Sequence, residues 1–213
     1  MKARVRWFSR KSPVEPGVWA ADGLIYREGA PVSHVNLPIK GAHNLENALA
    51  AVAICSLAGA TDPDIDRGLH TFQAVEHRLE HVRRLDDVDY YNDSKATNVD
   101  AAVKAVESFE GGLWLILGGR DKNSDYTALV GPLTGKIREA LLIGEATEKI
   151  RRQLEGRLPL RDCGTLEQAV RYARDQAKAG DAVLLSPACA SFDQFSSYGH
   201  RGREFKRIVG ELS

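Results

Sequence analysis

Residues 113–117 read Leu-Trp-Leu-Ile-Leu, and residues 182–185 read Ala-Val-Leu-Leu. Both are short, uninterrupted apolar runs, which is the composition of strands that are buried on both faces. Such strands occur where helices cover both sides of a parallel sheet. The two runs therefore predict the centre of a parallel sheet and an α/β fold.

The residues around these runs alternate between short apolar segments and segments with helical spacing. Within residues 75–213 the predicted strands are Leu79–Leu85, Asp89–Asn92, Leu113–Leu117, Glu139–Ile143, Leu158–Arg161 and Ala182–Ser186. The predicted helices lie around Val99–Ser108, Tyr126–Val130, Thr147–Leu154, Leu166–Lys178 and Arg201–Leu212. This alternation predicts a doubly wound α/β domain of about 140 residues.

The N-terminal third of the chain follows a different pattern. Residues 1–40 contain short alternating runs separated by glycine and proline, which predicts an antiparallel β segment. Helices should follow over residues 44–57 and 62–72, the second with Asp62 as its N-cap and Pro63 as its first residue. A unit of about 70 residues can bury only a small hydrophobic core, so we expect this unit to be part of a larger domain.

The composition limits the kinds of partner. The chain has 213 residues, with 29 Lys+Arg and 29 Asp+Glu, so its formal net charge is zero. A neutral chain lacks the broad basic surface of nucleic-acid-binding and membrane-surface-binding proteins. Cys55, Cys163 and Cys189 are widely spaced, no apolar run is long enough to span a bilayer, and residues 1–10 have no apolar signal region. We therefore expect a cytoplasmic protein with no nucleic-acid or membrane partner.

The loops that follow predicted strands are the first candidates for a functional site, because open parallel sheets bind ligands outside the carboxyl ends of their strands. These loops are residues 93–97 (Asp-Ser-Lys-Ala-Thr), 118–122 (Gly-Gly-Arg-Asp-Lys) and 187–191 (Pro-Ala-Cys-Ala-Ser). They carry cations, hydroxyls and glycines that allow close backbone approach, and helix N-termini follow. The three loops predict a pocket for a small anion.

Three further motifs resemble known catalytic or metal-binding motifs, but we do not expect them to have these functions. Residues 131–137 resemble a phosphate-binding loop but miss its spacing and lack Ser or Thr after Lys136, so we interpret them as a turn. Residues 77–81 (His-Arg-Leu-Glu-His) match an inverted zinc-protease motif, which needs a helix, whereas this segment alternates like a strand. Cys189 has no indicated histidine partner and is interpreted as a small buried residue. We predict no metal site.

Two polar groups allow more than one interpretation. Asn44 and Asn47 are three residues apart at the start of an apolar helix, where one of them could be the N-cap or both could bind a polar ligand. Thr97 or Asn98 could cap the next helix. Lys95 is unfavourable beside that helix N-terminus unless an anion binds there, which favours a functional role for this loop.

Five segments, in this order along the chain, form a known combination. They are Gly41-Ala-His-Asn-Leu-Glu-Asn-Ala-Leu-Ala50, Glu76-His-Arg78, Tyr91-Asn-Asp-Ser-Lys-Ala-Thr-Asn98, Leu117-Gly-Gly-Arg-Asp-Lys122 and Leu185-Ser-Pro-Ala-Cys-Ala-Ser-Phe-Asp-Gln-Phe195. Together they resemble the Mur ligase family, and within it the members that add D-glutamate. The resemblance covers residues 41–213.

The resemblance implies a domain organisation. Residues 1–74 would be the C-terminal part of the family's central ATPase domain, and residues 75–213 would be its Rossmann-like, amino-acid-binding ligase domain. The family's Gly-Lys-Thr/Ser phosphate loop and its magnesium ligands lie upstream of these segments, and the chain contains no such loop. We therefore expect the chain to correspond to a C-terminal half that is inactive alone.

The resemblance also implies an activity. It is ATP-dependent amide bond formation, through an acyl phosphate, between UDP-N-acetylmuramoyl-L-alanine and D-glutamate. This reaction belongs to peptidoglycan precursor synthesis, and so to cell wall biogenesis, cell shape and cell division. ATP and Mg²⁺ are the implied cofactors, and a cytoplasmic monomer is expected.

Site residues follow from the matching motif positions. The catalytic residues would be Lys95, which stabilises the phosphates and the developing oxyanion, and Asp93, which also holds the ribose. The nucleotide would be bound by Asn44, Asn47, Arg78 and Asp93. D-Glutamate would be bound by Thr97, Lys122, Ser191 and the backbone around Tyr198, where we expect a phenylalanine in the family. Arg120 and Asp121 receive no role.

Two alternatives stay open on the sequence alone. The chain could belong to another Mur-type or folylpolyglutamate-type amide ligase, in which case the loop at residues 187–191 would accept a different amino acid. It could also be a non-catalytic module that binds D-glutamate or a nucleotide. A hinge near Ala74–Glu76 is a further hypothesis.

Overall fold

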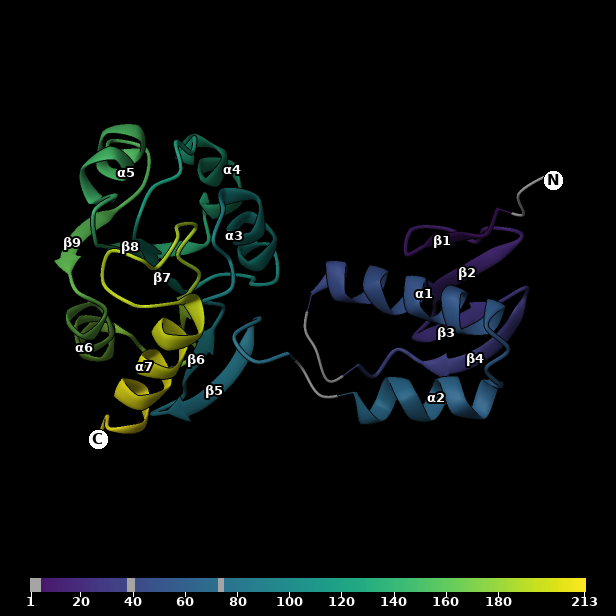
Figure 1. Ribbon diagram of the computed structural model, residues 1–213. Coiled ribbons are helices and arrows are strands. Elements are labelled where there is room, and N and C mark those ends of the chain that lie inside the picture. The colour runs from purple at the N-terminus through teal and green to yellow at the C-terminus, as the bar shows by residue number, and fades with distance from the viewer. Residues whose placement is uncertain (1–4, 38–40, 73–74) are drawn as a thin grey trace. The chain divides into compact units, whose positions relative to one another are not determined.

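The structure, a computed structural model, describes residues 5–37, 41–72 and 75–213 (Figure 1). The described residues fall into two compact units, within Met1–Ala74 and Val75–Ser213, and each has its own hydrophobic core. The hinge hypothesis rests partly on Ala74, which lies outside the described residues.

The C-terminal unit is built on one sheet. Within residues 75–213, all of which are described, six strands lie in the order β5 (Glu80–Leu85), β6 (Val88–Asn92), β10 (Ala182–Leu185), β7 (Leu113–Gly118), β8 (Ile137–Ile143) and β9 (Leu160–Gly164). Neighbouring strands are parallel except for β5 and β6, which are antiparallel. The last strand in sequence, β10, therefore lies between β6 and β7.

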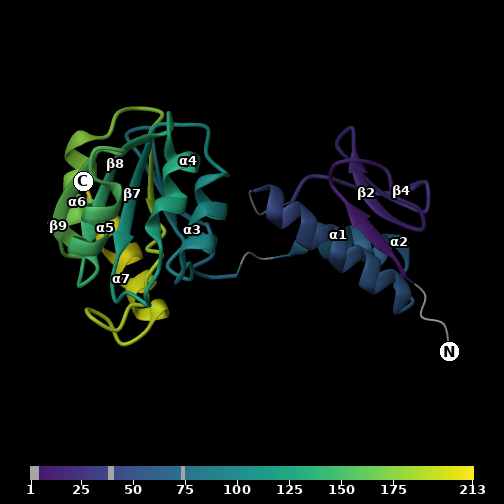
Figure 2. The same ribbon diagram turned by 90° about the horizontal axis from the view of Figure 1, so that it is seen from above.

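Helices cover both faces of this sheet (Figures 1 and 2). One core packs α3 (Val99–Val106), the 3₁₀-helix η1 (Tyr126–Leu129), α4 (Val130–Leu133) and α5 (Thr147–Leu154) on the first face. The other core packs α6 (Leu166–Gln176) and α7 (Tyr198–Gly210) on the second. Along β7, Leu115 and Leu117 belong to the first core, and Trp114 and Ile116 belong to the second. The predicted doubly wound α/β fold is confirmed, and β7 is apolar throughout because both of its faces are buried.

Some helix boundaries differ from the prediction. The last helix begins at Tyr198, three residues before the predicted start, because the Ser197 side chain caps it by accepting a hydrogen bond from the His200 amide (3.0 Å). The segment predicted as one helix from Tyr126 is a 3₁₀ turn that continues into α4. Of the two candidate caps for α3, Asn98 is the N-cap and accepts from the Ala101 amide (2.9 Å).

The N-terminal unit packs a small sheet against two helices. Within residues 5–37 and 41–72, the strands are β1 (Trp7–Ser9), β2 (Gly17–Ala21), β3 (Leu24–Arg27) and β4 (Ala30–His34), and the helices are α1 (Ala42–Leu57) and α2 (Asp62–Thr71). Its core includes Val18, Ile25, Leu49, Val52 and Ile65. Among the helices of both described units, none combines the length and the apolar character that crossing a bilayer requires.

Two predictions for the N-terminal unit are wrong. β1 pairs parallel with β2, whereas β2, β3 and β4 are antiparallel as predicted. A strand as short as β1 rises only about 10 Å, so residues 10–16, which can span up to about 23 Å, are long enough to bring the chain back to its start. The N-cap of α2 is Thr61, which accepts from the Asp64 amide (3.4 Å), and not Asp62.

Gly202 of α7 lies against the buried ring of His77. A Cβ at position 202 would overlap ring atoms of His77, whereas a Cβ at Gly210, in the last position of the same helix, would meet no atom within 4 Å. Gly202→Ala should therefore lower the free energy of unfolding by about 1–3 kcal/mol, because the ring or the helix must shift. Gly210→Ala should leave it unchanged or slightly higher. Denaturant unfolding measures both, and equal stabilities would contradict this packing.

Candidate functional site

The loops after β6, β7 and β10 meet at the carboxyl edge of the sheet. The Ser186 hydroxyl donates to Asp93 Oδ2 (2.8 Å), which joins the loops after β6 and β10. Arg120 and Ala190 exchange backbone hydrogen bonds of 2.9 and 3.1 Å, which joins the loops after β7 and β10. The three loops thus converge, as predicted. We call residues 93–97, 118–122 and 186–191 the rim.

Two glycines allow the rim loops to approach so closely. Gly118 and Gly119 have φ values of +127° and +132°, which side chains rarely adopt. A Cβ at Gly118 would overlap the carbonyl oxygen of Ile143, and a Cβ at Gly119 would overlap that of Ala190. The close backbone approach predicted for these glycines is therefore made to the end of β8 and to a neighbouring loop of the domain itself.

Arg201 of α7 is a buried residue that holds two rim loops together. Its side chain is 0% exposed. Its Nε donates to Ser94 Oγ (3.0 Å), and its Nη2 donates to the carbonyl oxygens of Ser94 (2.9 Å) and Cys189 (3.1 Å). Burial lowers the pKa of the guanidinium to about 10, so it is charged at neutral pH. Sequence reasoning missed Arg201, although it precedes Phe205 and Ile208 by helical spacing and so lies on their buried face.

Asp93 is buried within the rim. Its Oδ1 accepts from the Leu79 amide (3.1 Å) and its Oδ2 accepts from the Ser186 hydroxyl. Burial raises the pKa of Asp93 to about 6, against the lowering effect of these two hydrogen bonds and of the Arg78 charge. The carboxyl group ties the start of β5 to the rim, and its contact with a ribose stays a prediction.

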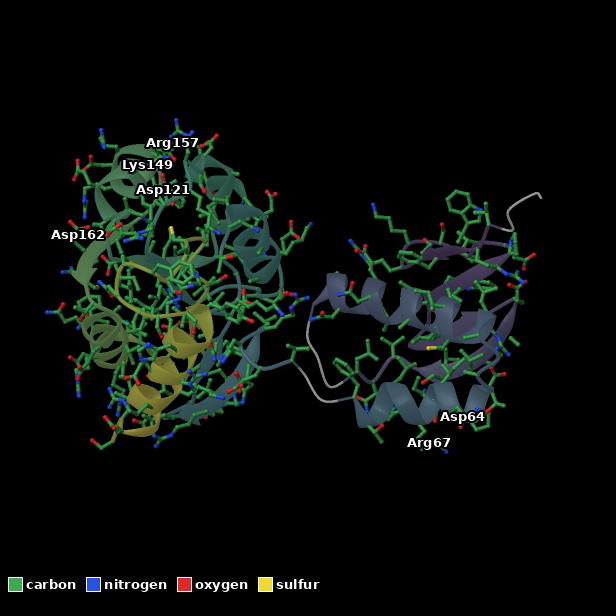
Figure 3. All side chains as sticks on the ribbon, viewed as in Figure 1. Asp64, Arg67, Asp121, Lys149, Arg157 and Asp162 are labelled. Atoms are coloured by element: carbon green, nitrogen blue, oxygen red, sulfur yellow. The ribbon has the colours of Figure 1, made fainter. Side chains whose placement is uncertain are left out.

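Asp121 organises the loop after β7 (Figure 3). It accepts hydrogen bonds from Lys149 Nζ (2.7 Å), the Tyr126 hydroxyl (2.8 Å) and the Ser124 amide (3.1 Å). Burial raises the pKa of Asp121, but these hydrogen bonds outweigh it and hold the pKa well below its usual range. Because the Tyr126 hydroxyl is also 2.9 Å from Cys189 Sγ, the network ties two rim loops together. Sequence reasoning gave Asp121 no role, although an aspartate three residues before Ser124 is typical of a local side-chain turn.

The residues of the rejected zinc and nucleophile motifs have other partners. Asn92 Nδ2 donates to Nδ1 of the buried His77 (2.9 Å), and burial lowers the pKa of this imidazole. His81 Nε2 lies 2.9 Å from Asp89 Oδ1. Within residues 5–37, 41–72 and 75–213, no group of three or more His, Cys, Asp or Glu side chains could hold a metal ion. The Cys189 thiol is buried, which raises its pKa to about 11, so it is a protonated packing residue at neutral pH.

The predicted D-glutamate residues and the predicted catalytic Lys95 all belong to the rim or to the start of α7. Lys95 and Thr97 are half-buried, Lys122 is exposed and Ser191 is buried. In the part of the chain that the structure describes, neither Lys95 nor Lys122 forms an ion pair. The exposed Tyr198 accepts a hydrogen bond from the Ser94 hydroxyl through its carbonyl oxygen (2.8 Å). The rim therefore offers two lysines whose charges are not neutralised within the described chain.

The predicted nucleotide residues are divided between the two units. Arg78 is exposed and belongs to the C-terminal unit. Asn44 and Asn47 belong to α1, where Asn44 is buried, Asn47 is exposed, and Asn47 Nδ2 donates to Asn44 Oδ1 (3.5 Å). The N-cap of α1 is Gly41, with no side-chain cap. The capping interpretation of the two asparagines is therefore wrong, and their contact with a nucleotide stays a prediction.

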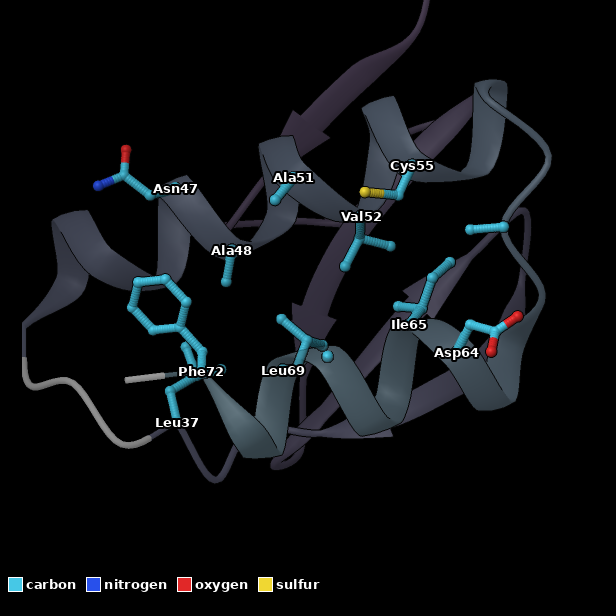
Figure 4. A pocket seen from close by; sticks show the side chains of 12 residues that line it. Leu37, Asn47, Ala48, Ala51, Val52, Cys55, Asp64, Ile65, Leu69 and Phe72 are labelled. Carbon is cyan, nitrogen blue, oxygen red and sulfur yellow. The ribbon is translucent and has the colours of Figure 1, made fainter. Parts of the chain in front are cut away.

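The N-terminal unit also contains an apolar pocket of about 370 Å³ between α1 and α2 (Figure 4). Val52, Ile65 and Phe72 line it, and its described lining includes no cation. Asn47 lies at its margin and points away from the apolar side chains. The lining does not have the charge that an anionic ligand requires.

A doubly wound sheet whose central loops converge on a polar rim defines a Rossmann-like α/β domain. A family model described as Mur ligase, glutamate ligase domain matches residues 77–189, which is more than half of the chain. The chain belongs to the Mur ligase family, and the resemblance noted from the sequence is confirmed.

Curated relatives match nearly the whole chain. The UDP-N-acetylmuramoylalanine–D-glutamate ligase of Solibacter usitatus is 53% identical over 212 residues, covering 99% of this chain and 48% of that protein. The ligase of the same name from Acidobacterium capsulatum is 48% identical over 216 residues, covering 97% of this chain and 46% of that protein. The chain thus spans about half the length of the curated relatives it matches.

A solved structure supports the fold. The pseudomurein peptide ligase type C of Methanothermus fervidus matches with a TM-score of 0.68 at 18% identity, covering 94% of this chain and 43% of that chain. At this identity the likeness shows the fold alone. It agrees with the doubly wound sheet described above.

Asp93→Asn is expected to change how stability depends on pH. Native Asp93 keeps its proton up to about pH 6, whereas an unfolded chain releases it near pH 4. The native state therefore binds more protons between these values, and stability falls as the pH rises from about 4 to 6, by up to about 3 kcal/mol. An asparagine at position 93 can still accept a hydrogen bond from the Leu79 amide and donate one to Ser186. The Asp93→Asn variant should therefore fold but should not lose stability between pH 4 and 6.

Asp121→Asn is the control of opposite sign. Because the native pKa of Asp121 is depressed, its contribution to stability is present at neutral pH and is lost as the pH falls below about 4. Urea unfolding of both variants and the wild type from pH 3 to 8 gives the profiles. A decline between pH 4 and 6 that persists in Asp93→Asn would show that another group causes it.

Proposed function

We propose that this chain forms the amino-acid-binding part of an ATP-dependent ligase that joins D-glutamate to UDP-N-acetylmuramoyl-L-alanine. Relatives that match almost all of the chain carry this ligase name. The convergence of the rim loops is the observation that carries the proposal, because it brings Lys95, Lys122 and Ser191 to one edge of the sheet. D-Glutamate has two carboxylates, which cations and hydroxyls bind through charge-assisted hydrogen bonds.

The proposed reaction forms an amide bond in two steps. The acceptor carboxylate takes the γ-phosphoryl group of ATP, which gives an acyl phosphate and ADP. The amine of D-glutamate, after losing a proton, attacks the acyl carbon, and the tetrahedral intermediate releases inorganic phosphate. Catalysis of this kind depends on positioning and on stabilisation of oxyanion charge. A rim with unpaired lysines and no ionised thiol fits these requirements.

The rim residues divide the recognition of D-glutamate between them. Thr97 and Lys122 hold its α-carboxylate. Ser191 and the backbone near Tyr198 hold its side-chain carboxylate. The two sets belong to different loops of the rim and to the start of α7, so a ligand with two carboxylates separated by a short chain fits this division better than one with a single carboxylate.

Other residues serve the nucleotide and the acyl phosphate. Lys95 and Arg78 supply positive charge for the phosphates and the oxyanion, and Asn44 and Asn47 lie near the adenine. Asp93 acts chiefly by fixing the loop that carries Lys95, since both of its oxygens already accept hydrogen bonds. Bound Mg²⁺ neutralises phosphate charge. We propose that its ligands belong mostly to other parts of the ligase, since no cluster of three or more His, Cys, Asp or Glu side chains occurs among the described residues. The whole ligase is proposed to be a cytoplasmic monomer.

Lys122→Met and Ser191→Ala test the proposed amino-acid site. Each removes a hydrogen bond to a carboxylate, which is worth about 1.5–3 kcal/mol, so each should weaken D-glutamate binding by about ten- to a hundredfold. Titration calorimetry of the chain with D-glutamate measures the affinity. Lys136→Met is the matched control, because Lys136 precedes β8 and so lies at the opposite edge of the sheet.

Two results would count against the proposal. An unchanged D-glutamate affinity in both rim variants would show that the assigned residues do not form the binding site. Binding of a different amino acid in place of D-glutamate would show that the proposed substrate is wrong. The chain alone should release no phosphate from ATP, with acceptor and D-glutamate present, because its sequence contains no Gly-rich phosphate loop. Measurable release would show that the loop is not needed.

A further inference from the structure

Arg201 carries a buried positive charge that no described carboxylate neutralises. Every acceptor of its guanidinium is neutral: the hydroxyl and carbonyl of Ser94 and the carbonyls of Cys189 and Ala190. No acidic side chain among the described residues lies within ion-pair distance of it. Other guanidinium groups of the same unit, such as those of Arg151 and Arg174, do bind carboxylates.

The position of Arg201 in its helix increases the free-energy cost of burying its positive charge. It is the fourth residue of α7, which begins at Tyr198, and a helix N-terminus is the positive end of the helix dipole. A buried ion without a partner is strongly unfavourable. Asp193 raises the pKa of the guanidinium from beyond ion-pair distance, but its Oδ2 accepts from the Glu145 amide (3.1 Å). Among the described carboxylates Asp193 therefore offsets this charge only in part, because it forms no ion pair with the guanidinium.

The same guanidinium hydrogen-bonds to two rim loops and lies near the third. It hydrogen-bonds to Ser94 and Ala190, and a Cβ built on Gly119 would lie 3.2 Å from its Nη1. Each of these positions is close in sequence to a residue proposed to bind ligand: Ser94 precedes Lys95, Ala190 precedes Ser191, and the nearby loop of Gly119 carries Lys122. Arg201 therefore adjoins the residues that are proposed to bind the ligand.

We propose that Arg201 is a positioning residue for anion recognition at the rim. Its guanidinium fixes the three loops in the arrangement that binds the ligand, and the bound anion supplies the negative charge that the domain lacks. Because Arg201 is fully buried beneath the loops, it does not touch the ligand. It acts on the ligand through the positions of the loops and through the electric field of its positive charge. The identity of the anion as D-glutamate rests on the proposed function, whereas the requirement for an anion rests on Arg201.

Two substitutions separate the charge of Arg201 from its geometry. Arg201→Met removes both and should weaken D-glutamate binding at least tenfold. It should weaken binding of D-glutamine, which carries one negative charge fewer, by much less. Arg201→Lys keeps the charge but loses the planar fork of donors, so it should bind D-glutamate more weakly than the wild type while keeping the preference for D-glutamate over D-glutamine.

Arg83→Met is the matched control. Arg83 Nη1 also donates to carbonyl oxygens, those of Val209, Gly210 and Leu212 at 3.0–3.1 Å, but it does so at the other end of α7. The variant loses a similar set of hydrogen bonds away from the rim. It should melt at a lower temperature than the wild type while its affinity for D-glutamate and its preference over D-glutamine stay unchanged.

Calorimetry on the whole chain, with inorganic phosphate as a second probe, decides between the outcomes. If Arg201→Met and Arg83→Met reduce all affinities equally, Arg201 is only structural and the inference is overturned. If Arg201→Met does not fold, an unchanged affinity of Arg201→Lys for D-glutamate and phosphate overturns it. If phosphate binds in an Arg201-dependent way and D-glutamate does not, the inference stands and the proposed substrate falls. Binding of neither probe by the wild type overturns the inference.

Discussion

The rim depends on an approach of loop backbones that only glycine permits. Gly118 and Gly119 let the loop after β7 lie directly against the carbonyl groups of Ile143 and Ala190. The backbone groups of the loops can then satisfy one another, and Arg201 can reach its acceptors in two of them at once. The positions of the chemical groups proposed to bind D-glutamate are therefore set mainly by backbone packing, and side-chain interactions contribute less.

The fold could be predicted because its signals are local. β7 and β10 are uninterrupted apolar runs since each contributes side chains to both cores, and the position of the rim follows from the parallel order of the strands. The parallel pairing of β1 could not be predicted, because it depends on the path of residues 10–16 and not on any local pattern. The cap of α2 was misplaced by one residue because Thr61 and Asp62 are both good N-caps.

The site could be predicted only in part, for a related reason. Lys95, Lys122 and Ser191 stand in short polar loops after apolar strands, which is a pattern that the sequence displays. Arg201 acts through partners that are distant in sequence, since the hydrogen-bonded Ser94 is 107 positions away. Asp121 combines local partners with Lys149, which is 28 positions away. An arginine in an amphipathic helix is ordinarily expected at the surface. Helical spacing places Arg201 on the face of Phe205 and Ile208, and the structure shows that its whole side chain is buried.

The insertion of β10 between β6 and β7 makes the order of translation matter. The strand pair β5–β6 and the three strands β7–β8–β9 are joined only through β10 in the strand order of this unit. The ribosome synthesises residues 182–185 after all the other strands. Until then β6 and β7 each lack one of their two neighbouring strands. Because domains fold as units, closure waits for the final segment, and this interval is when the newly made chain most needs protection from aggregation.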